Sequence, residues 1–151
     1  MRAYENDLFK IEQVQPGLWL LSEKMVKFTI RANAWIVEGL DADLVIDAGW
    51  GVVDWPLELL FPQRDKPLWM AVTHAHCDHM SQLHQFQSRR FGHADALPIV
   101  QAPTGLNTNA QPWTPRLGII DAGFEYLNFD AKNYGDNFTP GDLTDLVGEG
   151  D

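Results

Sequence analysis

The sequence has little cysteine and no long apolar run. Cys77 is the single cysteine among 151 residues, so no disulfide can form within the chain, which fits a reducing compartment. No apolar stretch reaches the roughly 18 residues that a membrane-spanning helix needs. The first residues also lack the basic, apolar and small-residue order of a signal peptide. We therefore expect a cytoplasmic protein with no membrane partner.

Basic side chains are scarce as well. Eleven Lys and Arg stand against 21 Asp and Glu, which leaves a formal net charge of -10. A surface of this sign repels phosphate backbones, so no nucleic acid partner is expected. What the chain does contain is 45% hydrophobic and 11% aromatic residues. This share is enough to bury a core and is too high for a disordered chain, so we expect one globular domain.

The first two thirds of the chain alternate between short apolar runs and turns, a pattern typical of strands. Helices are expected at 54–61, with Asp54 as N-cap, and from Asp78 or Ser81 to Arg90. The run at 44–47 is expected to be a buried central strand. The expected strands occupy residues 10–14, 18–21, 26–37, 44–47 and 68–73.

Beyond residue 103 the pattern loosens, because Gly, Pro, Asn and Asp interrupt almost every stretch of turn length. We expect a motif-bearing part at 1–103 and a loop-rich covering segment at 104–151. The aromatic side chains of that segment either line a substrate cleft or fasten the segment to the domain, and we favour the second interpretation. They are Trp113, Phe124, Tyr126, Phe129, Tyr134 and Phe138.

Candidate metal ligands are concentrated between residues 73 and 79, in the sequence THAHCDH. His74 and His76, two residues apart in an extended loop, can point the same way into one metal ion. Asp78 and His79 are adjacent, so they diverge from that pair and can reach a second ion. Imidazole nitrogen and carboxylate oxygen favour zinc, although iron or manganese would satisfy the same ligands. Cys77 follows His76 directly, should point away from its ion, and is expected to pack in the core.

A purely structural interpretation is that these histidines cap a helix or bond to the backbone. Their clustering argues against it. Three of the five histidines lie in this stretch together with a carboxylate, beside an expected helix N-terminus. Several partly desolvated imidazoles placed there would be electrostatically unfavourable without a cation to organise them. The sequence therefore predicts a metal site.

The motif, together with the run from Leu44 to Gly49, resembles the metallo-β-lactamase fold superfamily of metal-dependent hydrolases. That family carries HxHxDH after a buried strand and, upstream, a strand that ends in an Asp-x-Gly turn, as in Asp47-Ala48-Gly49. Asn33, in the preceding expected strand, also resembles the family pattern. The resemblance implies that His74 and His76 bind the first metal, that Asp78 and His79 bind the second, and that Asp47 supports the site without touching a metal. Met80-Ser81-Gln82 stands where the family often has two glycines.

The resemblance implies an α/β fold, an αββα sandwich of which this chain supplies mainly the N-terminal αβ half. The later ligands of the family, a histidine in a Gly-His turn, a bridging aspartate and a last histidine, have no counterpart. The other histidines, His84 and His93, lie just after the motif. We therefore expect one incomplete domain over 1–151. Its apolar strand residues, such as Leu44, Val45, Ile46 and Val72, should be poorly covered and should seek a missing C-terminal half or a second copy in a homo-oligomer.

The implied activity is metal-assisted hydrolysis of a small ester, thioester or lactone. A pair of zinc ions would lower the pKa of a water and present it as hydroxide to an electrophilic carbonyl. Asp78 is the expected catalytic residue, because it can orient that nucleophile and move its proton. The alternative is a truncated, non-catalytic half-domain that acts as a metal-binding or assembly module.

Overall fold

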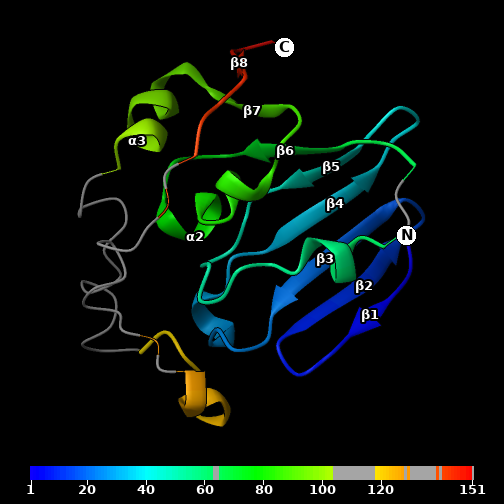
Figure 1. Cartoon of the computed structure of the whole chain (residues 1–151), viewed down its shortest axis with the longest axis vertical. Coiled ribbons are helices and arrows are strands. Elements are labelled where there is room, and N and C mark those ends of the chain that lie inside the picture. Colours follow the sequence, from blue (N-terminus) through cyan, green and yellow to red (C-terminus); the bar gives the residue numbers. More distant parts are fainter. Residues whose placement is uncertain (63–64, 104–117, 128, 130–138, 140, 151) are drawn as a thin grey trace.

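The structure, a computed structural model, describes residues 1–62, 65–103, 118–127, 129, 139 and 141–150. Its main feature is one eight-stranded sheet in which the order of the strands follows the chain (Figure 1). The first five strands pair antiparallel and the last four, beginning with β5, pair parallel. The strands are β1 (Tyr4–Glu5), β2 (Phe9–Gln15), β3 (Leu18–Glu23), β4 (Ala34–Glu38), β5 (Asp43–Ile46), β6 (Leu68–Val72), β7 (Arg90–His93) and β8 (Asp145–Val147).

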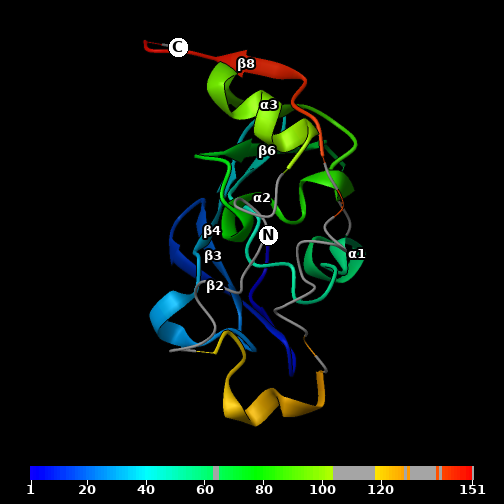
Figure 2. The same cartoon turned by 90° about the vertical axis from the view of Figure 1, so that its left-hand side faces the viewer.

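The helices are short. The α-helices α1 and α2 lie on the same side of the sheet, as the two perpendicular views show (Figures 1 and 2). Within the described residues no helix has the length and apolar character that crossing a bilayer requires. The helical elements are η1 (Phe28–Ile30), α1 (Leu57–Leu60), α2 (Cys77–Met80), η2 (Leu83–Gln85), η3 (Ala94–Ala96), α3 (Leu97–Gln101) and η4 (Ala122–Leu127).

Alternation along the strands separates two faces of the sheet. On β5 and β6 the side chains of Val45, Met70 and Val72 are buried, and they belong to the same core cluster as Leu60 of α1 and Met80 of α2. The residues between them on the same strands point to the opposite face and are only half-buried. Successive side chains of a strand point to opposite faces. The buried set therefore lies on the face that α1 and α2 cover, and the half-buried set lies on the other face.

The chain directions place one edge of the sheet at the site. β3 and β4 are antiparallel, as are β4 and β5, so β3 runs in the same direction as β5. β6 and β7 run parallel to β5. The carboxyl ends of these four strands therefore meet at one edge, where Glu23 ends β3 and where Asp47 and His74 follow β5 and β6.

Most expected strands are confirmed, but the strand expected at 26–37 is wrong over its first half. Residues 28–30 form η1, and β4 begins at Ala34. The guanidinium of Arg31 donates to the carbonyls of Lys24 and Val26, and the indole of Trp50 donates to the carbonyl of Ile30. These carbonyls are paired with side chains, so the segment forms a loop instead of a ladder.

Both expected helices are shorter than their patterns indicated. α1 has four residues, begins after Pro56 and has no side-chain cap, so Asp54 is not its N-cap. The helix expected to reach Arg90 also ends early, because α2 stops at Met80 and β7 begins at Arg90. Ser81, directly after α2, is buried and turns its hydroxyl to backbone carbonyls of another loop. That tertiary contact draws the chain away from a longer helix.

Of the four strand residues expected to be poorly covered, two are. Leu44 and Ile46 are half-buried, whereas Val45 and Val72 are 0% and 5% exposed, because they face α1 and α2. In the segment expected to be loop-rich, β8 extends the sheet beside β7. Trp113, Tyr134 and Phe138 lie outside the described residues.

Candidate metal site

The histidine motif lies directly after β6, at the carboxyl edge of the sheet. His74 and His76 are exposed, whereas Ala75 and Cys77 between and after them are buried. The two imidazole rings lie edge to face with 4.5 Å between their centroids. This alternation is what an extended segment produces, and it places both rings on the same side of the loop.

The remaining two predicted ligands come from α2, which starts within the motif. The ring of His79 lies 4.0 Å from that of His74, centroid to centroid. Its Nε2 atom is 3.3 Å from Oδ2 of Asp78. His76 occupies the N-cap position of α2 without a side-chain capping bond, so capping does not explain its place there. The structure thus brings His74, His76, Asp78 and His79 together.

Asp47 orients this cluster from the end of β5. Its Oδ1 accepts hydrogen bonds of 2.9 Å from the backbone N–H and the hydroxyl of Thr73, and its Oδ2 lies 2.8 Å from Nδ1 of His79. Asp47 is the one non-glycine residue with positive φ in the described chain, at 64°. Such a conformation persists only where surrounding contacts impose it, as these bonds do. With Nδ1 bound to Asp47, the His79 ring presents Nε2 to the Asp78 side.

Charges in the cluster depend on one another. Burial lowers the pKa of His79, but its bonds to Asp47 and Asp78 outweigh burial and raise that pKa to about 9. Burial, together with the neighbouring His79 and His76, lowers the pKa of His74. Burial raises the pKa of Asp78, but the bond and charge of His79 outweigh it, so this pKa lies below its ordinary value. The cluster therefore holds a positive charge on His79 that a bound metal would replace.

The donor set is of the kind that a divalent metal takes. Three imidazoles and one carboxylate follow one another as neighbours, His76 beside His74, His74 beside His79 and His79 beside Asp78. A carboxylate bonded to the far nitrogen of a histidine, as Asp47 is to His79, is the usual support of a histidine ligand. Among the described residues, however, no three His, Cys, Asp or Glu side chains converge as one metal-holding group. In this structure Nδ1 of His74 faces the Thr73 hydroxyl, and His79 is bonded on both sides by carboxylates.

The other sequence candidates take structural roles. Cys77 is 4% exposed, and burial raises the pKa of its thiol to about 12, which agrees with packing. Nδ1 of His84 contacts the carbonyl of Ser81, and Nδ1 of His93 accepts from the backbone of Asp95. Neither contact suggests a ligand.

Sequence reasoning missed three residues that hold the loop behind Asp47. They are Glu23, which is 1% exposed, Ser81 and Gln82. The sequence indicated Ser81 as a possible helix start and Met80-Ser81-Gln82 as a departure from the family pattern, but it indicated neither Ser81 nor Gln82 as a support of this loop. Glu23 had none, because an acidic residue at the end of a strand ordinarily lies in solvent.

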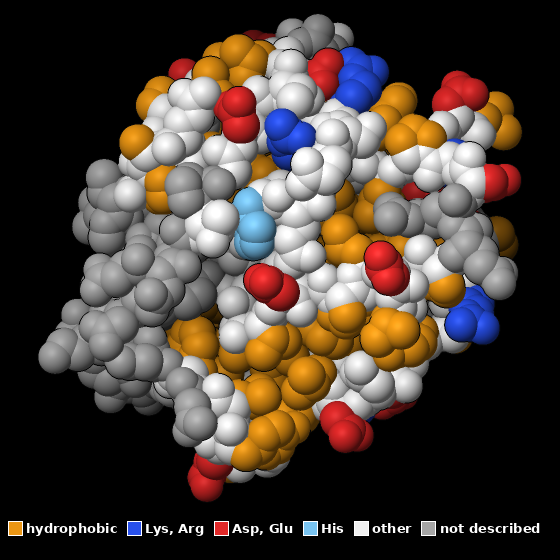
Figure 3. Space-filling view, viewed as in Figure 1, with side chains coloured by type: hydrophobic (Ala, Val, Ile, Leu, Met, Phe, Trp, Pro, Cys, Tyr) orange, Lys and Arg blue, Asp and Glu red, His pale blue; other side chains and the backbone are white. Residues whose placement is uncertain are grey.

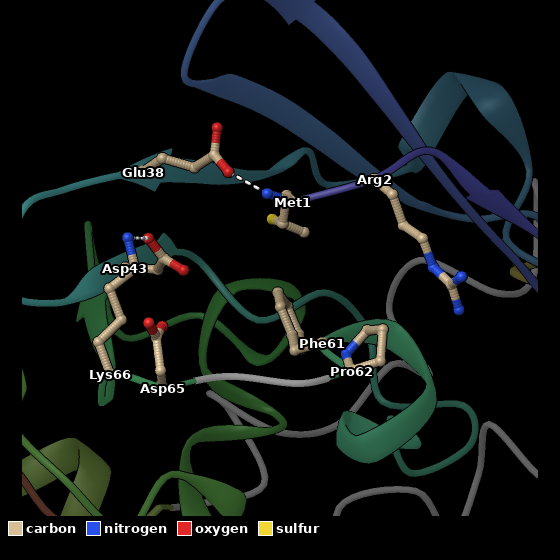
Figure 4. Close-up of a pocket in the computed structure, with 8 residues that line it drawn as sticks. All are labelled: Met1, Arg2, Glu38, Asp43, Phe61, Pro62, Asp65 and Lys66. Atoms are coloured by element: carbon tan, nitrogen blue, oxygen red, sulfur yellow. Dashed lines mark hydrogen bonds and ion pairs between the residues drawn. The ribbon is translucent and has the colours of Figure 1, made fainter.

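A pocket of about 370 Å³ lies at the opposite end of the sheet, between the end of β4 and the start of β5 (Figure 4). Its charged groups pair mainly with one another, as in the ion pair of Lys66 with Asp43. The carboxylate of Glu38 bonds to the amino group of Met1. A second pocket of about 400 Å³ is lined by Phe124 and Phe129, among others, beside Lys27. Figure 3 shows acidic side chains spread over the helix-bearing side of the molecule and apolar ones gathered in its lower half.

Comparison with protein families places the chain. The model of the metallo-beta-lactamase superfamily matches residues 29–151, and the chain belongs to this superfamily. The mixed sheet agrees with it. The metallo-beta-lactamase of Cronobacter sakazakii superposes with a TM-score of 0.58 at 15% identity, over 93% of this chain and 48% of that protein. Membership implies a divalent metal as the cofactor to test against the histidine cluster.

Two curated proteins resemble the chain in sequence. The acyl-coenzyme A thioesterase MBLAC2 of Bos taurus is 35% identical over 118 residues, which are 70% of this chain and 41% of that protein. The Homo sapiens protein of the same name is 34% identical over 91 residues, 53% of this chain and 33% of that protein. The chain thus spans less than half the length of the curated relatives that it matches.

Proposed function

We propose that this chain carries the metal-binding part of a hydrolase that cleaves acyl thioesters. The observation that carries the proposal is the gathering of His74, His76, His79 and Asp78 at one edge of the sheet, with Asp47 bonded to His79. Four donors on one short loop and the helix after it, supported by a buried carboxylate, are more than packing requires. Superfamily membership supports the reaction class.

In the proposal His74 and His76 hold one zinc ion, and Asp78 and His79 hold the other. When bound, the metal supplies Lewis acidity and lowers the pKa of a water toward neutrality. Asp47 keeps the Nδ1 proton of His79, so that Nε2 of this ring remains the ligand atom. Asp78 is the proposed catalytic residue: its carboxylate accepts a hydrogen bond from the attacking water and passes the proton to the leaving thiolate.

An acyl thioester is the substrate class that we favour over esters and lactones. The curated relatives are named as acyl-coenzyme A thioesterases. The formal charge of -10 weighs against a nuclease.

We further propose that a second layer completes the site, either the remaining half of a longer protein or a second copy of the chain. The support is the apolar face of the sheet opposite α1 and α2. Its side chains are half-buried or exposed, and none of the described elements covers them as a helix layer covers the other face. They are Leu18, Leu20, Trp35, Val37, Leu44, Ile46, Trp69 and Phe91. A mixed sheet of this kind is ordinarily covered on both faces.

The test combines metal content with turnover. The purified chain and its His76→Ala variant are dialysed against trace Zn²⁺, and bound metal is measured together with oligomeric mass. We expect metal in the wild type and its loss in the variant, and thioester cleavage measured by thiol release that follows the metal. His93→Ala is the matched control, because this exposed histidine lies on β7 and bonds to Asp95. Equal metal well below one ion per chain in all three proteins would refute the proposal.

A non-catalytic half-domain is the second candidate. Two observations favour it: within the described residues no three donor side chains converge as one group, and His74 and His76 are exposed to solvent. Open sites with few ligands bind metal more weakly than closed four-ligand sites. Metal bound without cleavage of any ester, thioester or lactone, in both the monomer and an assembly with the completing half, would favour this candidate.

A further inference from the structure

A buried carboxylate outside the histidine cluster lies at the end of β3. The side chain of Glu23 accepts hydrogen bonds from the backbone N–H groups of Trp50 (2.7 Å) and Gly51 (3.2 Å) and from the indole N–H of Trp55 (3.0 Å). All three donors belong to one loop, residues 47–56, between β5 and α1. A buried carboxylate is costly unless its oxygens are bonded, and here the partners are supplied by a single loop.

This loop begins with Asp47, and its first turn fits closely against Glu23. Gly49 adopts φ 64°, and a Cβ atom at this position would lie 2.7 Å from the Glu23 carboxyl group. Glycine is therefore needed for its backbone conformation and for the close approach of the carboxylate. The backbone N–H of Ala48 donates to the carbonyl of His79, which ties the same turn to α2.

The opposite side of the loop is held by the two residues after α2. The hydroxyl of Ser81 lies 2.7 Å from the carbonyl of Gly49. The amide of Gln82 accepts from the backbone of Trp55 and donates to the carbonyl of Val53, and Gln82 is 0% exposed. The loop is thus fixed between β3 and the end of α2, and Glu23 supplies the fixation from the β3 side.

We propose that Glu23 is a positioning residue: its carboxylate holds the loop 47–56 in place so that Asp47 stays bonded to Thr73 and to Nδ1 of His79. The expected effect on metal binding rests on the metal site proposed above, because a displaced Asp47 would leave the ring of His79 without its supporting hydrogen bond. Glu23 touches none of the predicted ligands and acts through the loop. A merely structural role would destabilise the whole chain without singling out Asp47.

The test uses the 151-residue chain with Glu23→Gln, which replaces one acceptor oxygen of the carboxylate by an NH2 group that donates and cannot accept. Asp43→Asn is the matched control, because Asp43 is a buried carboxylate at the opposite end of the sheet, paired with Lys66. Amide hydrogen exchange of Thr73 reports on Asp47, whose Oδ1 accepts from that amide, and Met70 in β6 serves as the internal reference. Titration with Co²⁺, followed by its absorption spectrum, reports on the metal site.

For Glu23→Gln we expect Thr73 to exchange at least about tenfold faster relative to Met70, and Co²⁺ affinity to fall about tenfold, the size typical of losing support behind a ligand. Asp43→Asn should change neither. If Glu23→Gln does not fold, the same measurements are made on Trp55→Phe, which removes only the indole donor to Glu23. Wild-type exchange and affinity in the folded variant, or equal changes in Asp43→Asn, would overturn the inference. A wild type that binds no Co²⁺, with Thr73 still released in the variant, would instead refute the proposed function alone.

Discussion

Both faces of the sheet carry apolar side chains, but the described helices bury only one of them. Val45 and Met70 point toward the helices and are both 0% exposed, whereas their neighbours Leu44 and Trp69 point to the opposite face and are half-buried. Strands that are apolar on both faces are typical of sheets buried on both sides. The comparison teaches that β5 and β6 are built for two covering layers, of which the described helices provide one.

The histidine cluster lies at the edge where these faces meet. Asp47 follows β5, and the motif follows β6, its neighbour in the sheet. His74 and His76 are open to solvent in the described residues, so any further ligand would come from the second layer proposed above.

The largest effect is expected from charges placed on the two faces of one strand. Val45→Asp buries an unpaired carboxylate among apolar groups and should lower the free energy of unfolding by about 3 to 5 kcal/mol, enough to unfold a small domain. Leu44→Asp, one residue earlier on the other face, should cost about 1 kcal/mol. Urea denaturation followed by tryptophan fluorescence measures both. Equal losses would mean that both faces are covered.

Support of the metal site should give the next effect. Asp47→Asn keeps the size of the side chain but weakens its bond to Nδ1 of His79, and we expect metal affinity to fall about 10- to 100-fold. Asp54→Asn is the control, because that carboxylate is exposed and lies 3.8 Å from His84 instead. Competition with a chromophoric chelator measures both affinities. An unchanged affinity in Asp47→Asn would show that the bond to His79 does not support metal binding.

A smaller effect is expected on the less covered face. The ring of Trp69 packs against that of Phe91 in a tilted arrangement, with 5.7 Å between the ring centroids, and the guanidinium of Arg89 lies 5.0 Å from the centroid of the Trp69 ring. Trp69→Ser should cost the isolated chain about 1 kcal/mol, since the ring is half-buried. If a second copy covers this face, the variant should also lose the dimer, which sedimentation equilibrium would show. A dimer that survives the substitution would place its interface elsewhere.

Substitution of Cys77 is expected to have no effect on the metal site. With a pKa of about 12 and 4% exposure, its thiol should react with iodoacetamide at pH 8 at least about 100-fold more slowly in the folded chain than in urea. Cys77→Ala should leave the metal content unchanged, because the side chain packs on the covered side of the motif. Loss of metal in this variant would make Cys77 a ligand and would contradict the division between exposed histidines and buried cysteine.

Local patterns predicted much of the framework. The β2 and β3 hairpin, β5 and β6 follow from apolar runs and turn residues that are neighbours along the chain. Errors arose where distant groups intervened. Arg31 and Trp50 bond to carbonyls in the segment expected to be a strand, and Ser81 bonds to the loop after β5 where a helix was expected to continue.

The sequence by itself determined the donors of the candidate site and their order, because the alternation of an extended segment depends on the backbone alone and places His74 and His76 on one side. It also determined which strands would be apolar. Only the tertiary structure decided that Glu23 is buried, since its partner Trp50 lies 27 residues away, and which face of the sheet the helices cover. Burial depends on which distant elements pack together on folding, and residue spacing along the chain does not predict that packing.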